Sequence, residues 1–340
     1  MGKGTRACVV VPTIREASIL EFLRRWEPEF ADQRVIVVED NPGRTFALPA
    51  WVEHYCWSDI AEHLGEQAWI IPRRTDCVRS FGSYLAYQQD CDFVVSLDDD
   101  CFPEAEYAPS FLGMVAAALD RSWPSGRWWN TMGADGPYPR GFPYDVRDDA
   151  APTCVHHGLW SNIPDLDART QARLPDYRSA PATTLARVPH GSYFPMCAMN
   201  LAFRREVIPA MYFLLMGQDA NGEPWPFDRF GDIWAGIIVK KIADHLGQAI
   251  TSGAPSVHHA RASSVDVNLV KESPGYPVNE LFWRRIDEVE LTRRTFVGCY
   301  REIAHTVRLD GQYWDRLRHA MVTWADLFSP AVPVTKSPDW

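Results

Sequence analysis

The first hundred residues alternate short apolar runs with amphipathic segments, and no other feature of the chain constrains its fold as strongly. Apolar runs occupy Ala7–Val11, Val35–Val38 and Phe93–Leu97, while Glu16–Trp26 and Cys77–Gln88 show the spacing of helices. Strands that alternate with helices are typical of a parallel sheet covered by helices. The sequence therefore predicts an α/β fold with a mixed, mainly parallel sheet.

Three consecutive carboxylates follow the third apolar run. The stretch FVVSLDDDCF places Asp98, Asp99 and Asp100 at the end of a predicted strand. Adjacent carboxylates repel one another and lose solvent at a strand end, so a divalent cation is the natural compensation. Oxygen ligands favour Mg²⁺ or Mn²⁺ over zinc or copper. A solvated turn or helix cap rich in aspartate is the alternative, but caps rarely need three aspartates after so apolar a strand.

Polar residues also end the first two runs, where Thr13 and Arg15 follow one strand and Asp40 follows the next. The carboxyl ends of parallel strands meet at one edge, so we expect these residues beside the aspartate triplet. They suit uracil and ribose, with turn and capping roles as the alternative. Arg79, on the helix before the triplet, suits a phosphate. The chain lacks GxGxxG and GxxxxGK[ST], which excludes the usual dinucleotide and P-loop sites.

The amino-acid composition limits the classes of molecule that the protein is expected to bind. A net charge of −10 without a basic run argues against nucleic acid. The eight cysteines form no CxxC pair, which favours reduced thiols in the cytoplasm. No apolar stretch approaches the length of a membrane span. We expect a cytoplasmic protein that binds a phosphorylated small molecule.

The rest of the chain is predicted to hold loops and then helices. Residues 137–195 are dense in Pro, Gly and aromatic residues, which predicts long ordered loops that build the site. The apolar residues of Asp228–Leu246 recur at helical spacing and predict a helix. Val289–Phe328 is predicted to form two helices with a break near Asp310 and Gly311. We divide the chain into a catalytic domain, residues 1–285, and a helical C-terminal extension, residues 286–340.

Seven segments in order along nearly the whole chain resemble one family: VVPTIRE, SLDDDCFP, PRGFPYDVR, HGLWSNIPD, FPMCAMNLAF, DIWAG and AMVTW. The family is the reversibly glycosylated polypeptides, also called UDP-arabinopyranose mutases, of glycosyltransferase family 75. The resemblance implies a GT-A-like (Rossmann-like) fold, a divalent metal, and interconversion of UDP-L-arabinopyranose with UDP-L-arabinofuranose. It also implies assembly with further copies or related subunits.

The resemblance assigns roles to individual residues. It implies that Arg140 becomes glycosylated and that Arg147 is a second essential arginine. It also implies that the triplet holds the metal and the diphosphate. Asp98 and Asp99 are then expected at the nucleotide, and Asp98 and Asp100 at the metal. A guanidinium is a poor nucleophile, so from chemistry alone Arg140 is first a phosphate ligand, then a surface residue. In an alternative mechanism Arg140 is only an electrostatic clamp, and UDP itself leaves and re-adds. This alternative stays open beside the covalent route.

Asp232 opens the DIWAG segment and is a candidate base or sugar-hydroxyl acceptor, or simply a helix-start residue. Related plant proteins have two aspartates here, whereas this chain has Gly231 before Asp232, which leaves the sugar specificity open. His259 matches a family histidine and is a candidate metal ligand, with a core role as the alternative.

Other histidines and tryptophans are weaker candidates for the site. We expect His258 to be structural, and His156 and His157 either to contact the sugar or, as we favour, to bond loop carbonyls. Four tryptophans are candidates for stacking on a sugar or for the core: Trp128, Trp129, Trp160 and Trp234.

Two other functions compete with the mutase. A net or self-glycosylating glycosyltransferase would use the same UDP-sugar donor and would need an acceptor groove. A non-catalytic glycosylated scaffold or partner subunit is the third hypothesis, with Gly231 as its only hint. The intact aspartate triplet argues against the scaffold, because an inactive copy has no reason to keep three clustered carboxylates.

Overall fold

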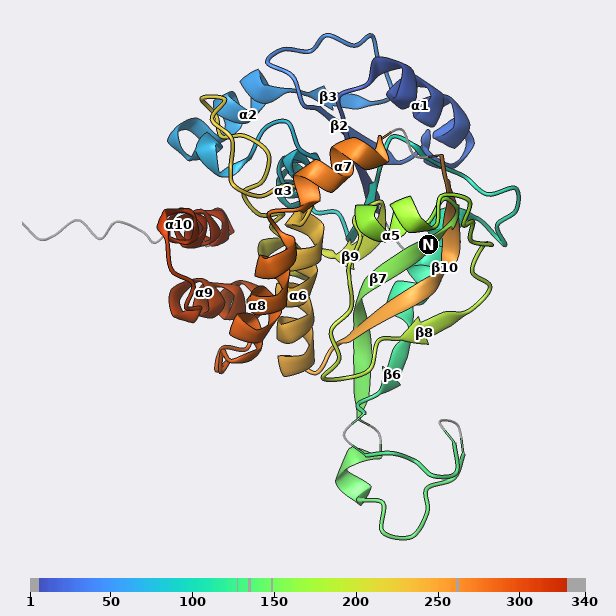
Figure 1. Ribbon diagram of the computed structural model, residues 1–340. Helices are drawn as coiled ribbons and strands as arrows, with labels where there is room; N and C mark the ends of the chain where they lie inside the picture. Colours follow the sequence, from blue (N-terminus) through green and yellow to red (C-terminus); the bar gives the residue numbers. More distant parts are fainter. Residues whose placement is uncertain (1–5, 127, 134–135, 148, 261–262, 329–340) are drawn as a thin grey trace, which may run out of the picture.

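The computed structural model describes residues 6–126, 128–133, 136–147, 149–260 and 263–328, and shows one large twisted sheet flanked by helices (Figure 1). Along the sheet the strands run β3 (Glu53–Tyr55), β2 (Arg34–Glu39), β1 (Ala7–Thr13), β4 (Phe93–Leu97), β9 (Asn200–Arg204), β7 (Ala150–Asn162), β10 (Ala249–His259) and β5 (Cys101–Phe102). Two short strands extend it: β6 (Ser122–Pro124) pairs with β7, and β8 (Leu185–Arg187) with β10.

The sheet is mixed. Strands β3, β2, β1 and β4 are parallel to one another, and so are β7 and β10. Strand β9 runs antiparallel between β4 and β7, and β5 runs antiparallel to β10. The predicted α/β class with a mixed sheet is therefore confirmed.

Helices bury both faces of the parallel half. Val9 and Val11 of β1 pack in one apolar cluster with α1 (Glu16–Phe30) and α4 (Phe111–Asp120). Cys8 and Val10 pack in the other cluster with α2 (Trp57–Leu64), α3 (Arg79–Gln88) and α6 (Gly231–His245). Successive side chains of a strand point to opposite faces, so a strand covered on both sides reads as one continuous apolar run.

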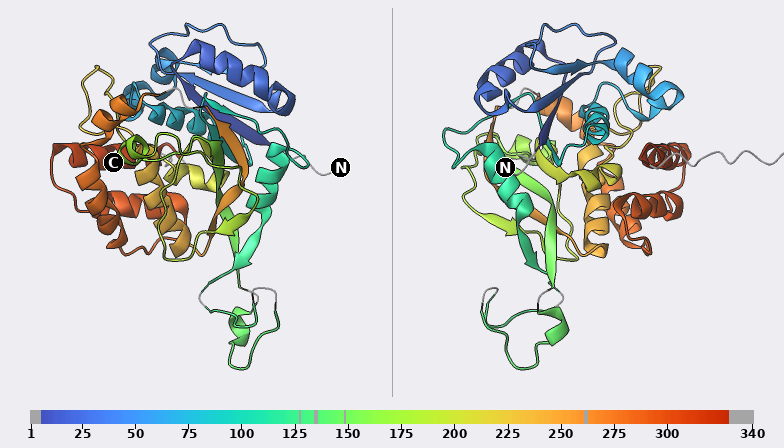
Figure 2. Two further views of the ribbon diagram at one scale, coloured as in Figure 1. Left: turned by 45° about the vertical axis from the view of Figure 1, so that its right-hand side comes forward. Right: turned by 180° about the vertical axis from the view of Figure 1, so that it is seen from behind.

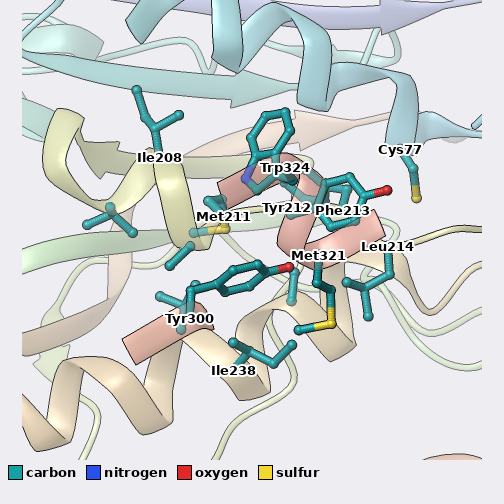
Figure 3. Close-up of a cluster of buried hydrophobic side chains, with 14 of the residues drawn as sticks. Cys77, Ile208, Met211, Tyr212, Phe213, Leu214, Ile238, Tyr300, Met321 and Trp324 are labelled. Carbon is teal, nitrogen blue, oxygen red and sulfur yellow. The ribbon is translucent and has the colours of Figure 1, made fainter. Parts of the chain in front are cut away.

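The two helices predicted within Val289–Phe328 are α9 (Phe296–Thr306) and α10 (Gln312–Asp326). Two further helices, α7 (Val265–Glu272) and α8 (Tyr276–Asp287), precede them and were not predicted. The predicted break falls at Gly311, whose φ of 120° favours glycine. Trp324 of α10 stacks on Tyr212 at 5.2 Å between ring centroids, within the core that Figure 3 shows. The division at residue 286 stays a prediction, and its last twelve residues, 329–340, lie outside the described part.

The prediction of mostly loops across residues 137–195 was wrong for residues 150–162, which form the 13-residue strand β7. Helix α5 (Ala168–Arg173) and strand β8 also lie in this region. The stretch contains Pro152 and Gly158, so its local composition argues against a strand. Pairing with β9 and β10 on either side decides the outcome, because tertiary context overrides strand propensity.

Residues 125–149, here called the arm, connect β6 to β7 and project away from the body of the molecule (Figures 1 and 2). Residues 127, 134, 135 and 148 of the arm are not among the described residues. The amide of Ser125 donates to the carbonyl of Asp149 at 3.2 Å and closes the base of the arm. The arm therefore begins at the amino end of β7.

Candidate active site

A cavity of about 1600 Å³ opens at the carboxyl ends of the parallel strands. Its wall contains eight of the residues predicted for the site: Thr13, Arg15, Asp40, Asp98, Asp99, Asp100, Asp232 and His259. The expected meeting of the strand ends is thus confirmed. This is the position at which open α/β sheets bind ligands.

Asp99 is neutralised by the protein itself. The hydroxyl of Thr13 donates to Asp99 Oδ2 at 2.6 Å, and the guanidinium of Arg15 bonds both oxygens of the same carboxylate. Arg15 also lies 3.3 Å from Asp100 Oδ2. Burial raises the pKa of Asp99 in spite of these partners. Asp99 therefore fixes Arg15 and the end of β1 at the cavity wall.

Arg79 is buried and orients Asp98. Its Nε donates to the carbonyl of Asp76 at 3.0 Å, and its Nη1 donates to the Ser96 hydroxyl at 2.7 Å and to the Ala198 carbonyl at 2.8 Å. Its Nη2 bonds the carboxylates of Asp76 and Asp98. Burial acts to raise the pKa of Asp98, but Arg79 outweighs it and holds that pKa below its usual value. Its donors are thus engaged within the protein, and Arg79 is not part of the cavity wall, so the structure does not bring it to the place predicted for a phosphate.

His259, at the end of β10, lies opposite Asp100, the residue directly before β5. The register of β10 against β5 sets His259 opposite Cys101, next to the triplet. His259 Nδ1 lies 2.7 Å from the carbonyl oxygen of Ile163, which can only accept, so Nδ1 carries the proton. In the neutral ring Nε2 keeps its lone pair, and it lies 3.8 Å from Asp100 Oδ1.

Across the described residues, no group of three or more His, Cys, Asp or Glu side chains is gathered closely enough to hold a metal ion. Asp98 is held by Arg79, and Asp99 by Thr13 and Arg15. Asp100 in turn lies 3.3 Å from Arg15 Nη2 and 3.8 Å from His259 Nε2.

Asp40 anchors a second group of polar and aromatic residues, which the sequence did not predict. It accepts from Trp57 Nε1 at 2.7 Å and from the amide of Thr75 at 2.8 Å. Burial raises the pKa of Asp40 despite these bonds. The guanidinium groups of Arg73 and Arg74 lie 5.3 and 5.1 Å from the Trp57 ring. Arg74 has a φ of 56°, a strained backbone of the kind that clusters at functional sites.

Asp232 lies in the first turn of α6 and faces the cavity. Its Oδ2 accepts from the amide of Ala198 at 3.1 Å. Burial, with the nearby charges of Asp76 and Asp165, raises the pKa of Asp232 to about 7. A carboxyl group with this pKa can both donate and accept a proton at neutral pH.

Asp76 and Asp165 also line the cavity and were missed by the sequence prediction. Burial and the charges of Asp98 and Asp228 raise the pKa of Asp76 in spite of Arg79. Asp165 ends the quoted segment HGLWSNIPD and Asp76 opens a short 3-10 helix, but neither follows an apolar strand, so the strand-end pattern did not point to them.

Gly231 is explained by packing. A Cβ atom at this position would lie 2.2 Å from Sγ of Cys77 and 3.5 Å from Cγ of Met216. A side chain at residue 231 would therefore point into the core, and Asp232 alone faces the cavity.

Arg140 and Arg147 lie on the arm, so the structure does not bring them to the cavity. Strand β7 runs from the arm to Asn162, which pairs with His259. Twelve residue steps along a strand span about 40 Å. Arg140 is exposed, whereas Arg147 is half-buried and lies 3.7 Å from the Tyr144 ring.

The four candidate tryptophans lie in three different environments. Trp160 lines the cavity, Trp234 is buried in the core with its Nε1 bonded to Asn279, and Trp128 and Trp129 are exposed on the arm. The expectation that His156 and His157 bond loop carbonyls was wrong.

Both histidines lie on β7 and pair with hydroxyls of β10, His156 with Thr251 and His157 with Ser252, each at 3.1 Å. His258 lies 3.4 Å from the hydroxyl of Ser161, a contact in keeping with a structural role.

The fold and the carboxylate-lined cavity define an α/β protein with a Rossmann-like architecture of the nucleotide-sugar-binding kind. The chain belongs to the reversibly glycosylated polypeptide family, whose model matches residues 4–332. Among its relatives are "UDP-arabinopyranose mutase 1" of Arabidopsis thaliana, 36% identical over 97% of this chain and 94% of the relative, and "UDP-arabinopyranose mutase 1" of Oryza sativa subsp. japonica, 36% identical over 96% and 91%. "UDP-arabinopyranose mutase 2" of Arabidopsis thaliana is 35% identical over 97% and 93%. Among the described residues no helix is long and apolar enough to cross a membrane.

Proposed function

We propose that this protein is a UDP-arabinopyranose mutase that interconverts UDP-L-arabinopyranose and UDP-L-arabinofuranose. The observation that carries the proposal is the meeting of the aspartate triplet with Asp232 in one cavity at the strand ends. Relatives that carry this activity in their names match nearly the whole chain. A cytoplasmic location belongs to the proposal, supported by eight free cysteines.

Asp100 and His259 are the proposed ligands of Mn²⁺ or Mg²⁺, with Asp98 beside them. Mg²⁺ is commonly bound by one or two carboxylates together with substrate phosphates, so two protein ligands fit this mode. The metal would supply positive charge to the diphosphate as it leaves. Arg79 contributes by holding Asp98 in position, and the half-buried Arg15 contributes a guanidinium beside Asp99 and Asp100.

The nucleoside is proposed to bind at the part of the cavity wall formed by Asp40, Arg74 and Thr75. A carboxylate accepts hydrogen bonds from ribose hydroxyls, and Trp57 orients Asp40 through its Nε1. The Thr13 hydroxyl is engaged with Asp99, so we assign Thr13 to shaping this wall. The diphosphate then extends from this end toward Asp100.

Asp232 is the proposed proton carrier of the ring exchange. When the pyranose becomes a furanose, the former ring oxygen gains one proton and the hydroxyl that closes the new ring loses one. The exchange therefore needs no net acid or base, only a group that both takes up and releases a proton near neutral pH. Asp232, with a pKa of about 7, meets this requirement.

In the covalent version of the reaction a guanidine nitrogen bonds to the anomeric carbon while UDP departs with the electron pair of the broken C–O bond. The proton that the guanidinium loses passes to a carboxylate such as Asp232. Arg140 of the same chain lies on the arm, which projects away from the body of the molecule. The covalent version is therefore proposed to use Arg140 of another molecule, and the alternative is departure and return of UDP with no arginine bond.

Incubation of the purified protein with UDP-L-arabinopyranose and Mn²⁺, followed by anion-exchange separation and NMR of the products, tests the proposal. We expect UDP-L-arabinofuranose at equilibrium, and none in the presence of chelator. Accumulation of free UDP and sugar-labelled protein without the furanose would instead establish a self-glycosylating transferase.

A further inference from the structure

The arm exposes a group of aromatic and apolar side chains. They are Trp128, Trp129, Met132, Tyr138 and Tyr144, with Trp129 84% and Tyr144 82% exposed. An exposed apolar surface of this kind marks an interaction site in a water-soluble domain. Tryptophan and tyrosine are also the residues most enriched in the centres of protein interfaces.

The described part of the arm is held in one shape by its own contacts. Phe142 is buried between Trp128 and Tyr138, with ring centroids at 5.9 and 4.8 Å. Arg147 lies over the Tyr144 ring, and the Tyr138 hydroxyl donates to the Arg147 carbonyl. The exposed aromatic residues therefore sit on an ordered support, which lowers the entropy cost of docking.

The cavity contains more negative charge than the chain neutralises. Asp76, Asp165 and Asp232 all line it, and the raised pKa of Asp232 arises from burial and from the charges of the other two. Arg79 pairs with Asp76, and Arg229 acts on both Asp76 and Asp165. The cavity wall nevertheless contains eleven Asp or Glu residues against five Arg or Lys residues. A further cation from outside would relieve this repulsion.

Space for a second occupant is present as well. Pockets for single small molecules have volumes of about 300 to 1000 Å³. The cavity here measures about 1600 Å³.

We propose that the arm of one copy docks at the cavity of a second copy and places Arg140 beside the carboxylates of Asp76 and Asp232. The guanidinium matches the excess of carboxylates in charge, and the aromatic residues around it supply apolar contact area. A second copy is the occupant because the chain's own arm projects away from the body that holds its cavity (Figures 1 and 2), and Arg140 is not part of its own cavity wall. The inference rests on the proposed function for its activity test only.

Complementation between two inactive variants tests the docking. Arg140→Ala keeps an intact cavity, and Asp232→Asn keeps an intact arm. We expect each alone to be nearly inactive and an equimolar mixture, after subunit exchange, to recover up to about a quarter of wild-type turnover, because half of the symmetric dimers are mixed and each has one complete site. Activity of the mixture equal to the sum of its parts would overturn the inference.

Sedimentation provides a test that needs no activity. We expect the wild-type protein to associate at micromolar concentration and the double variant Trp129→Ala/Tyr144→Ala to shift to monomer. Val270→Ala is the matched control, because Val270 is 74% exposed on α7, outside the arm. A monomeric wild type, or an arm variant that associates unchanged, would contradict the inference.

The two tests separate the proposals. If the wild type forms no arabinofuranose but sediments as expected, the proposed function fails and the docking stands. If the wild type is active and complementation is absent, only the docking fails.

Discussion

His259 Nε2 lies 3.8 Å from Oδ1 of Asp100, and the hydrogen bond from His259 Nδ1 to the Ile163 carbonyl directs Nε2 toward that carboxylate. The two residues meet because Asp100 directly precedes β5, which pairs antiparallel with β10. A histidine fixed in this way by its second nitrogen is the usual arrangement of a metal-binding imidazole.

Removal of this imidazole should weaken metal binding. We expect His259→Gln to lower the affinity for Mn²⁺ at least about 10-fold in the presence of UDP, since changes around a metal ligand commonly cost 10- to 100-fold. Electron paramagnetic resonance of free Mn²⁺ measures the affinity. His258→Gln on the same strand is the control, and equal affinities in the two variants would remove His259 from the metal site.

Arg79 should matter for stability as well as for activity. Arg79→Met removes the partner of Asp98 and leaves a buried carboxylate unpaired, which costs about 3 to 5 kcal/mol of unfolding free energy. Urea unfolding measures the loss. Arg24→Met on the exposed face of α1 is the control, and an equally small effect of both would refute the role of Arg79 as the support of Asp98.

Asp232 should make stability depend on pH. Its pKa is raised in the folded protein from an ordinary value of 3.8 to about 7, so its stabilising contribution is complete below about pH 4 and is lost as the pH rises through 7. We therefore expect Asp232→Asn to gain stability relative to the wild type between pH 4 and 7, and to keep a constant difference above that range. Thermal unfolding across this range checks the sign, and a difference that stays flat would contradict the raised pKa.

Gly231 should tolerate no side chain while Cys77 is present. We expect Gly231→Ala to cost about 1 to 3 kcal/mol, the usual range for overpacking, because its Cβ would meet Sγ of Cys77 at 2.2 Å. The double variant Cys77→Ala/Gly231→Ala should recover much of this loss. If the double variant is no more stable than Gly231→Ala alone, contact with Cys77 is not the reason for the glycine.

The sequence predicted the part of the site that lies directly after regular strands. Thr13, Asp40 and the aspartate triplet end apolar runs, and parallel strands must bring such ends together. Asp76 and Asp165 were missed because neither follows an apolar strand, and their positions depend on the whole fold.

The sequence pattern also did not predict the strand β7 or the position of the arm. Residues 150–162 contain turn-forming residues and become a strand through pairing on both sides. The arm, with Arg140, precedes the amino end of β7, whereas the carboxyl end of β7 lies at the cavity. No local motif predicts this separation.

The most direct measurement compares wild-type protein and Asp232→Asn in one NMR time course of UDP-L-arabinofuranose formation. Loss of a positioned proton carrier costs about 10²- to 10⁴-fold in rate, so we expect at least a 100-fold decrease. UDP affinity should stay unchanged, because Asp232 is assigned to the sugar. Wild-type turnover by Asp232→Asn would show that the ring exchange does not use this carboxyl group and would contradict the account.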